Sequence, residues 1–154
     1  MTTNNIDYKV RLRQQCITIL KDRIATIETA MVTAQSAANN EEKSSAGDKY
    51  ETSRAMSHRE KDMQGRQLLA NQNELAAIVS VEIFKTLGWV TAGNLVCCNT
   101  LKFFIVAGLG KINFEGELIY LVSPLAPLAK TMMGKYIGDI IIFNTTPHVI
   151  TSIF

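Results

Sequence analysis

The sequence predicts an α+β protein, in which an antiparallel helical hairpin is followed by a small β domain with one short helix. Most charged residues of the 154-residue chain lie before Ser80, whereas all three prolines and most aromatic residues and glycines lie after it. Because proline and glycine break helices, the first part favours long helices and the second favours short strands and turns. We therefore expect a coiled-coil hairpin over residues 1–79 and a β domain over residues 80–154.

A first long helix is predicted over residues 5–38. Apolar residues recur there at steps that add up to heptads, which is the pattern of a seam packed against a second helix. Residues 39–47 collect turn formers and charges and predict the turn of the hairpin. The seam residues of this first helix are Val10, Ile17, Leu20, Ile24, Ile27, Met31, Ala34 and Ala38.

A second helix is predicted over residues 48–79. Four small or apolar residues recur at heptad spacing and predict the stripe that faces the first helix. A glycine within this helix costs about 1 kcal/mol relative to alanine, so this seam is the weaker of the two. The stripe consists of Met56, Met63, Ala70 and Ala77, and the glycine is Gly65.

The second part of the chain contains short runs that are rich in β-branched and aromatic residues and bounded by turn formers. A short helix is predicted over residues 127–133, because Pro127 lies near its first turn and Gly134 follows its end. Gly108 and Lys111 bound a glycine-rich segment that predicts a hairpin turn, and Trp89 is expected in the core or in the packing of the hinge. The predicted strands are residues 95–100, 102–107, 117–122, 139–143 and 148–154.

Charge, hydropathy and cysteine content exclude several classes of function. A net charge of +2 is too small for non-specific binding to nucleic acid. No apolar run approaches the roughly 20 residues that a membrane span needs, and the polar N-terminus lacks a signal core, so we expect a cytoplasmic protein. Cys97 and Cys98 are adjacent, which disfavours a disulfide between them, and strand alternation predicts one in the core and the other exposed or facing a sheet edge. His58 and His148 lack the spacing of a zinc site.

Two motifs lie where the hairpin turns and where the short helix begins. Gly47, Asp48 and Glu51 form a pattern of glycine, aspartate, two variable residues and glutamate before a helix, and residues 122–139 are VSPLAPLAKTMMGKYIGD. These motifs, in a chain with a hairpin before a β domain, resemble the Gre family of transcript-cleavage and elongation factors, which enter the secondary channel of bacterial RNA polymerase. The second motif matches the family signature at Ser123, Pro127, Gly134, Lys135, Gly138 and Asp139.

The resemblance implies an FKBP-like fold for residues 80–154, which would dock on the polymerase while the hairpin reaches inward. It implies a protein that is not itself an enzyme but stimulates cleavage of backtracked transcripts by the polymerase. The implied partners are core RNA polymerase and, indirectly, the 3′ end of the nascent RNA. No membrane and no small-molecule substrate are implied.

Asp48 and Glu51 are the candidate residues for this activity. They are three residues apart at the start of a helix, so their carboxylates can share one face. Mg²⁺ prefers oxygen ligands and keeps several waters, so the two carboxylates can contribute to a magnesium site that a partner completes. We expect Mg²⁺ only in the polymerase complex and no cofactor in the free protein. Acids in a first turn also complement the helix dipole, and this structural role stays open, as it does for Glu41 and Glu42 as solvating residues of the turn.

Arg54 and Arg59, with Arg66, are candidates for contact with the phosphates of an extruded RNA end or with the polymerase. The alternative is a solvated helix face in which Glu60 and Asp62 are their ion-pair partners.

Three departures from the family pattern keep other functions open. Lys49 replaces the customary apolar residue after the aspartate, and Thr52 replaces the asparagine after the glutamate, which favours a non-cleaving regulator or inhibitor in the same channel. Ala126 stands where the second serine of the signature is expected. An FKBP-like peptide-binding chaperone module is the alternative of a different class. An independent enzyme has the least support, because no nucleophile and base pair is visible.

Overall fold

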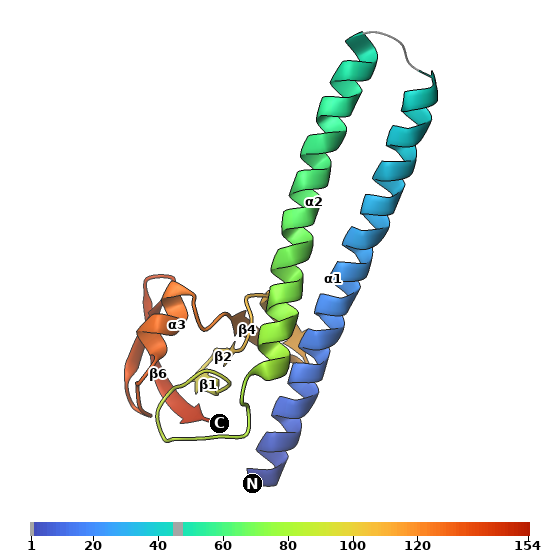
Figure 1. The fold of residues 1–154 in the computed structure, drawn as a ribbon. Coiled ribbons are helices and arrows are strands. Elements are labelled where there is room, and N and C mark those ends of the chain that lie inside the picture. Colours follow the sequence, from blue (N-terminus) through green and yellow to red (C-terminus); the bar gives the residue numbers. More distant parts are fainter. Residues whose placement is uncertain (1, 45–47) are drawn as a thin grey trace. The chain divides into compact units, whose positions relative to one another are not determined.

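In the computed structural model the chain has a mixed helix and sheet architecture, so the predicted α+β class is confirmed. Two long helices precede a six-stranded sheet that is accompanied by one short helix (Figure 1). The structure describes residues 2–44 and 48–154, and it describes their side chains except those of residues 2, 3, 38, 41–44 and 48–54. The chain divides into two compact units, Thr18–Leu75 and the combination of Met1–Ile17 with Ala76–Phe154.

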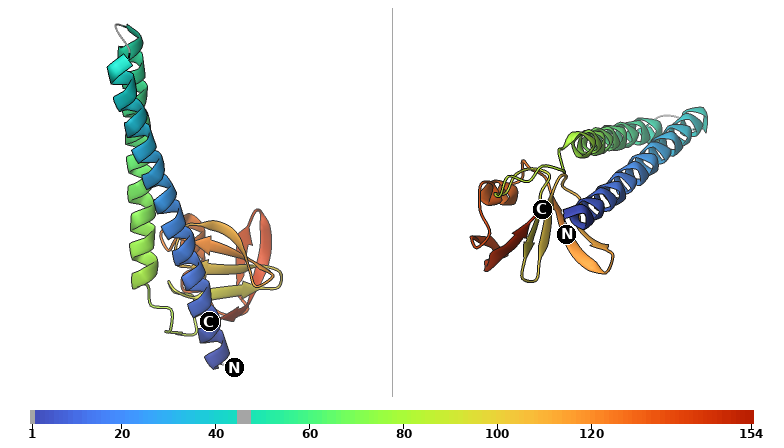
Figure 2. Two further views of the ribbon diagram at one scale, coloured as in Figure 1. Left: turned by 90° about the vertical axis from the view of Figure 1, so that its right-hand side faces the viewer. Right: turned by 90° about the horizontal axis from the view of Figure 1, so that it is seen from below.

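The unit Thr18–Leu75 is a pair of antiparallel helices that run side by side in both views of Figure 2. It contains most of α1 (Thr2–Ser44) and of α2 (Asp48–Ser80), whose remaining residues belong to the unit with the sheet. The prediction that the second helix begins at Asp48 is confirmed. The predicted turn at residues 39–44 is wrong, because α1 continues through them. Gln35 Nε2 donates a hydrogen bond to Asn39 Oδ1 at 3.1 Å, a pair that supports an additional helical turn. No described helix is long and apolar enough to cross a membrane.

The inward face of α1 largely follows the predicted seam. Leu20 is fully buried, and Ile24, Ile27, Met31 and Ala34 are half-buried. Val10 is 38% exposed and does not belong to the seam. In the first turns the inward positions are instead those of Lys9, Leu12 and Cys16, which are buried in the unit that contains the sheet.

The predicted seam of α2 is wrong. Met56 and Met63 are 65% and 54% exposed, and Ala70 and Ala77 are exposed as well. The less exposed stripe lies one position further along, where polar residues recur at the same heptad spacing. Two leucines share that stripe, whereas two arginines flank the methionines, and burying the leucines rather than the arginines decides which stripe faces inward. The inward stripe is Ser57, Gln64, Leu68, Asn71, Leu75 and Ile78.

The second unit is built on a sheet whose strands follow the order β3-β4-β2-β1-β6-β5. Neighbouring strands are antiparallel except for β2 and β4, which pair in parallel. Helix α3 (Pro127–Met132) lies between β4 and β5 along the chain. The strands are β1 (Leu95–Cys98), β2 (Lys102–Ile105), β3 (Gly110–Phe114), β4 (Glu117–Val122), β5 (Ile140–Phe143) and β6 (Thr146–Ile153).

Five of these strands overlap the predicted ones, and β3 is additional. The predicted hairpin turn at Gly108–Lys111 is wrong, because β3 begins at Gly110 and pairs with β4 rather than with β2. The two hairpins β3–β4 and β5–β6 have tight turns. Glu115 and Gly116 join β3 to β4 with φ angles of 50° and 83°, and Asn144 and Thr145 join β5 to β6 with φ angles of 50° and 64°. Two successive residues with positive φ are typical of the turns that match strand twist.

The core of this unit occupies both faces of the sheet. On one face, Val96, Cys98 and Phe103 pack in a cluster with Ala129 and Met132 of α3. Because side chains alternate along a strand, Leu95, Cys97 and Phe104 lie on the other face, and they too are buried. The expectation that one of the adjacent cysteines is exposed is therefore wrong, since Cys97 and Cys98 are each 6% exposed.

Candidate functional site

The first motif, Gly47, Asp48 and Glu51, lies at the start of helix α2, and Gly47 is outside the described residues. Asp48 is the first residue of the helix, and Glu51 follows within the same turn. This spacing places the two Cα atoms on one face of the helix, as expected. The side chains of both residues, and that of Arg54, lie outside the described residues, as do those of Glu41 and Glu42. The prediction that this turn contributes ligands to a magnesium ion therefore stays a prediction.

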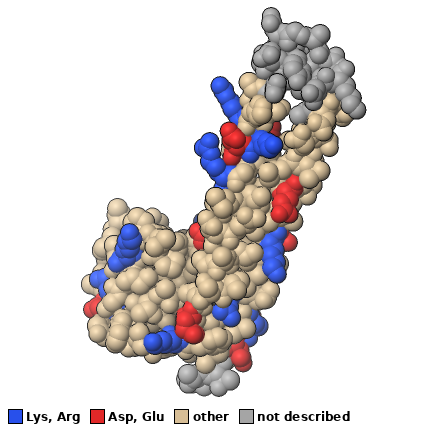
Figure 3. All heavy atoms as spheres, in the orientation of Figure 1, with Lys and Arg blue, Asp and Glu red and all other residues tan. Residues whose placement is uncertain are grey.

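Beyond the tip, the surface of the hairpin is polar and mixed in charge. Arg59 and Arg66 are exposed on α2, and so are Glu60 and Asp62. Figure 3 shows basic and acidic side chains interspersed along the hairpin on the face that it draws. The exposed arginines are available to a phosphate, and the neighbouring acids limit any attraction to bulk nucleic acid.

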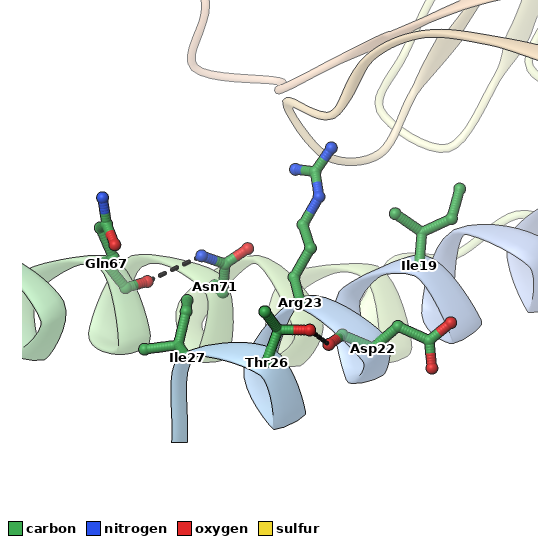
Figure 4. A pocket seen from close by; sticks show the side chains of 7 residues that line it. All are labelled: Ile19, Asp22, Arg23, Thr26, Ile27, Gln67 and Asn71. Carbon is green, nitrogen blue, oxygen red and sulfur yellow. Dashed lines mark hydrogen bonds between the residues drawn. The ribbon is translucent and has the colours of Figure 1, made fainter. Parts of the chain in front are cut away.

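A shallow groove lies between α1 and α2 at the middle of the hairpin. It has a volume of about 520 Å³ and is lined by side chains from both helices (Figure 4). Two of its polar groups are engaged within their own helices, since Asn71 Nδ2 donates to the carbonyl of Gln67 and Thr26 Oγ1 donates to that of Asp22. The lining residues are Ile19, Asp22, Arg23, Thr26, Ile27, Gln67 and Asn71.

The C-terminal signature forms the connection from β4 through α3 to β5. Ser123 Oγ accepts a hydrogen bond from the backbone N–H of Leu125 at 3.2 Å, and its carbonyl accepts one from that of Ala126 at 3.0 Å. Pro127 occupies the first turn of α3, where its missing N–H costs nothing. Ser123 and Pro127 thus set the turn and the start of the helix, as the sequence predicts for Pro127.

The second half of the signature joins α3 to the sheet and to the segment before β1. Gly134 and Gly138 have φ angles of +79° and +95°, which side-chain-bearing residues rarely adopt. The backbone N–H of Gly134 donates to the carbonyl of Val90 at 2.9 Å, and the carbonyl of Lys135 accepts from the N–H of Val90 at 2.8 Å. Asp139 Oδ2 accepts a hydrogen bond at 2.8 Å from the backbone N–H of Tyr136. Each signature residue here has a structural role.

Exposed apolar residues belong to the signature segment or pair with it. Leu125 is 80% exposed, and Tyr136 and Ile137 are 55% and 61% exposed. Trp89 pairs with Tyr136 through an isolated β-bridge, and their ring centroids are 6.1 Å apart. Of the two places expected for Trp89, the core is wrong, since this residue is 38% exposed, and a place in the packing of the hinge stays a prediction. We call these four residues the signature ridge, and aromatic and apolar residues of this kind are typical of docking surfaces.

Buried polar side chains lie where the first turns of α1 meet the sheet. Lys9 is 2% exposed, and its Nζ donates hydrogen bonds to the carbonyls of Ile83 and, at 2.9 Å, of Phe154. Burial lowers the pKa of Lys9 to about 8. Asn94, which is fully buried, donates to the same carbonyl of Phe154 at 3.0 Å. Sequence patterns did not indicate this network, because neither residue belongs to a recognisable motif.

The surface around this junction is polar. Tyr8 packs edge-on against Phe114 with a centroid separation of 5.3 Å and donates a hydrogen bond to Glu117 at 3.3 Å. Burial, together with the charge of Glu117, raises the pKa of Tyr8 to about 12. A hydrogen bond from Lys102 lowers the pKa of Glu117. These groups neutralise one another and attach α1 to the sheet.

The cysteines are buried free thiols. Cys16, Cys97 and Cys98 form no disulfide. Burial raises the pKa of Cys16 to about 12 and also raises the pKa values of Cys97 and Cys98. Because the thiolate is the reactive form, these thiols are inert at neutral pH.

Within the described part of the chain, no group of three or more His, Cys, Asp or Glu side chains is placed to hold a metal ion. Comparison of the chain with models of protein families, with curated proteins and with solved structures finds no match. The resemblance to the Gre family thus rests on the motifs themselves.

Proposed function

We propose that this protein is a Gre-like regulator of bacterial RNA polymerase. The unit with the sheet, to which we assign an FKBP-like fold, docks on the rim of the enzyme, and the α1–α2 hairpin enters the secondary channel. The observation that carries this proposal is the signature segment. Ser123, Pro127, Gly134, Gly138 and Asp139 all lie in one system of turns and backbone hydrogen bonds, which presents the signature ridge to solvent. A family signature maintained by such turns supports a shared fold.

The proposed activity lies in the first turn of α2. Asp48 and Glu51 are spaced to offer two carboxylates from one helix face, and hard oxygen donors fit Mg²⁺. In a two-metal site of the polymerase complex, one Mg²⁺ would activate the water that hydrolyses the RNA phosphodiester, and the other would stabilise the leaving oxygen. Asp48 and Glu51 would hold one of these ions by charge, from the first turn of α2.

The docking half of the proposal is tested with variants of the signature ridge. Leu125→Lys places a charge on the most exposed residue of the signature ridge, and Tyr136→Ala removes the ring that lies beside Trp89. Both variants should weaken binding to purified core polymerase at least about tenfold in a pull-down or an interferometry titration, because a buried charge or a lost aromatic anchor costs about 1.4 kcal/mol or more. Leu118→Lys, at a position that is 44% exposed in β4, is the matched control and should bind normally.

The cleavage half is tested with Asp48→Asn combined with Glu51→Gln. The amides retain the size of the carboxylates but are far poorer ligands for Mg²⁺, so stimulated cleavage of a stalled elongation complex should fall by about two orders of magnitude while polymerase binding is retained. Asp62→Asn, an exposed acid further along α2, is the control. A purely structural role of the tip acids predicts a slightly lower melting temperature and unchanged cleavage.

Two specific residues favour a second candidate within the same class. Lys49 and Thr52 depart from the family pattern on either side of Glu51, and a lysine beside the acids reduces their net negative charge. A protein that binds polymerase through the signature ridge but does not stimulate cleavage at any Mg²⁺ concentration is a non-cleaving regulator. Failure to bind core polymerase at moderate salt removes both candidates and favours the peptide-binding chaperone module.

A further inference from the structure

The two edges of the sheet differ in how they are protected. Edge strand β3 contains the exposed Lys111, and the contacts of Tyr8 with Phe114 and of Arg11 with Glu115, the latter at 2.9 Å, lie at its end. Such charges and covering segments keep a strand edge from pairing with other chains. Edge strand β5 has the sequence IIIF, with no charge, and within the described chain it pairs only with β6.

The ladder between β5 and β6 determines which backbone groups of β5 point outward. The N–H of Ile150 donates to the carbonyl of Asp139 at 2.9 Å, and the carbonyl of Ile150 accepts from the N–H of Gly138 at 2.8 Å, so Ile150 directs both of its backbone groups towards the chain that leads into β5. Hydrogen-bonded and non-hydrogen-bonded pairs alternate along an antiparallel ladder. Ile140, opposite Val149, and Ile142, opposite Pro147, therefore occupy non-hydrogen-bonded positions. Their N–H and C=O groups point to the open edge, and Pro147, which has no N–H, fits the position that it occupies.

The side chains around this open edge are apolar. Ile140 and Ile142 are 52% and 59% exposed, whereas Ile141 between them is 1% exposed and belongs to the core. On the same outer face, Val149 of β6 is 41% exposed, and Pro147 is exposed beside it. A strand edge and an apolar face thus coincide at one end of the sheet.

We propose that β5 is a homodimerisation edge, at which two copies of this chain pair antiparallel through Ile140–Phe143 to continue the sheet. With Ile141 on the two-fold axis, Ile140 of one copy faces Ile142 of the second copy. Every outward N–H of these residues then meets an outward C=O of the other copy. The pairing uses only the exposed edge and does not depend on the proposed binding to polymerase.

The charge pattern favours a second copy as the occupant. Residues 140–154 contain no Lys, Arg, Asp or Glu, so two identical edges meet without repulsion between like charges. The two outward residues are also self-complementary, because an antiparallel pair centred on Ile141 is symmetric, as a two-fold interface requires. The outer faces of both copies then form one apolar surface across the junction. A strand from another protein would find no charged group on this edge that selects it.

Sedimentation equilibrium of the full chain tests the proposal. The protein should show a reversible monomer–dimer equilibrium between about 10 μM and about 1 mM, and two substitutions should raise the dimer dissociation constant at least about tenfold. Ile142→Lys puts a charged side chain opposite the apolar Ile140 of the second copy, so each dimer would hold two charges against apolar neighbours. Ile142→Pro removes only the outward N–H, since that residue donates no bond to β6. Leu118→Lys, the same chemical change in β4, should leave the dimer unchanged.

Hydrogen exchange gives an independent readout of the same pairing. The amides of Ile140 and Ile142 should exchange rapidly at low concentration and become protected at high concentration, while that of Ile141 is protected in both. A chain that stays monomeric to about 1 mM, or a dimer whose strength Ile142→Lys and Ile142→Pro do not change, overturns the proposal. In the first case the edge is left for a strand of a different protein.

Discussion

The hairpin unit and the unit with the sheet stabilise their structures in different ways. Among the side chains that the structure describes in residues 18–75, those of Leu20 and Gln64 are the buried ones, and the second is polar. The unit with the sheet buries a cluster on one face that includes Phe103, Met132 and Ile150, and further apolar residues on the other. Because burial of apolar area is the main stabilising term, substitutions should be costly near the sheet and mild in the hairpin. A lightly packed hairpin leaves most of its surface available for contact with a partner.

A pair of glycines gives the largest expected contrast between the two units. A Cβ added at Gly93 would lie 2.0 Å from the carbonyl oxygen of Glu82, and Gly93 has a φ of +86°. The same atom added at Gly65 in α2 meets nothing within 4 Å. Gly93→Ala should therefore destabilise the protein by about 3 kcal/mol or more, whereas Gly65→Ala should stabilise α2 by about 0.5–1 kcal/mol.

Chemical denaturation of both variants, followed by circular dichroism, measures these changes. Gly65→Ala serves as the control for the substitution itself, because it makes the same chemical change in open space. Equal effects of the two substitutions would contradict the assigned difference in packing.

The polar seam of the hairpin is the basis of a second, smaller effect. Gln64 is 7% exposed, and its Nε2 lies 3.4 Å from Glu60 Oε1. Its Oε1 has no hydrogen-bond partner among the residues that the structure describes. Gln64→Leu should raise the free energy of unfolding of the hairpin by about 1–2 kcal/mol, because an unsatisfied buried oxygen is replaced by apolar atoms. Hydrogen exchange of the α2 amides measures the change. Gln67→Leu, at an exposed position in the same helix, should leave exchange unchanged, and an equal response of both variants would place Gln64 outside the seam.

The buried lysine beside the sheet predicts the smallest effect, a dependence of stability on pH. The pKa of Lys9 is about 8 in the folded protein and 10.5 when unperturbed, so between these values the unfolded chain binds more protons than the folded one. The contribution of Lys9 to stability therefore rises as the pH increases from about 8 towards 10.5. The raised pKa of Cys16, about 12, acts in the opposite direction above pH 9.

The contribution of Lys9 is isolated by comparison with Lys9→Met, which retains the apolar stem. Urea unfolding at pH 7, 8 and 9 should show the stability of the wild type rising relative to that of Lys9→Met. A constant difference across this range would mean that Lys9 remains equally protonated in both states, contrary to its burial.

The elements that sequence patterns predicted correctly are those whose signals are local. The start of α2 at Asp48, the first turn of α3 at Pro127 and its end before Gly134 follow from the residues at those positions. Heptad spacing likewise located the inward face of α1 from Leu20 to Ala34. In each case a few neighbouring residues determine the backbone conformation, so no distant contact is needed.

The features that patterns missed depend on contacts between distant segments. Strand β3 is short, begins with Gly110 and is stabilised by its pairing with β4, so its sequence alone resembles a turn. The inward stripe of α2 lies one residue further along the chain than predicted. Heptad spacing does not distinguish two adjacent stripes until their packing partners are known. Cys97 was expected to alternate with an exposed neighbour, which fails for a strand that is covered on both faces.

The candidate site divides in the same way. The acids Asp48 and Glu51 and the signature from Ser123 to Asp139 are recognisable in the sequence, and so is the absence of charge after Asp139. The sequence does not show three other features, which are the exposure of the signature ridge, the burial of Lys9 and the outward direction of the backbone groups of Ile140 and Ile142.

By itself, the sequence determined that this protein has two long helices before a sheet-forming part, and where α3 begins and ends. Only the tertiary structure decided the parallel pairing of β2 with β4, the polar stripe that faces α1, the burial of Lys9 and the bare edge at β5. The physical reason is the distance along the chain over which each interaction acts. Helix periodicity and capping act over a few residues, whereas strand order, burial and exposure depend on which distant segments exclude water from one another.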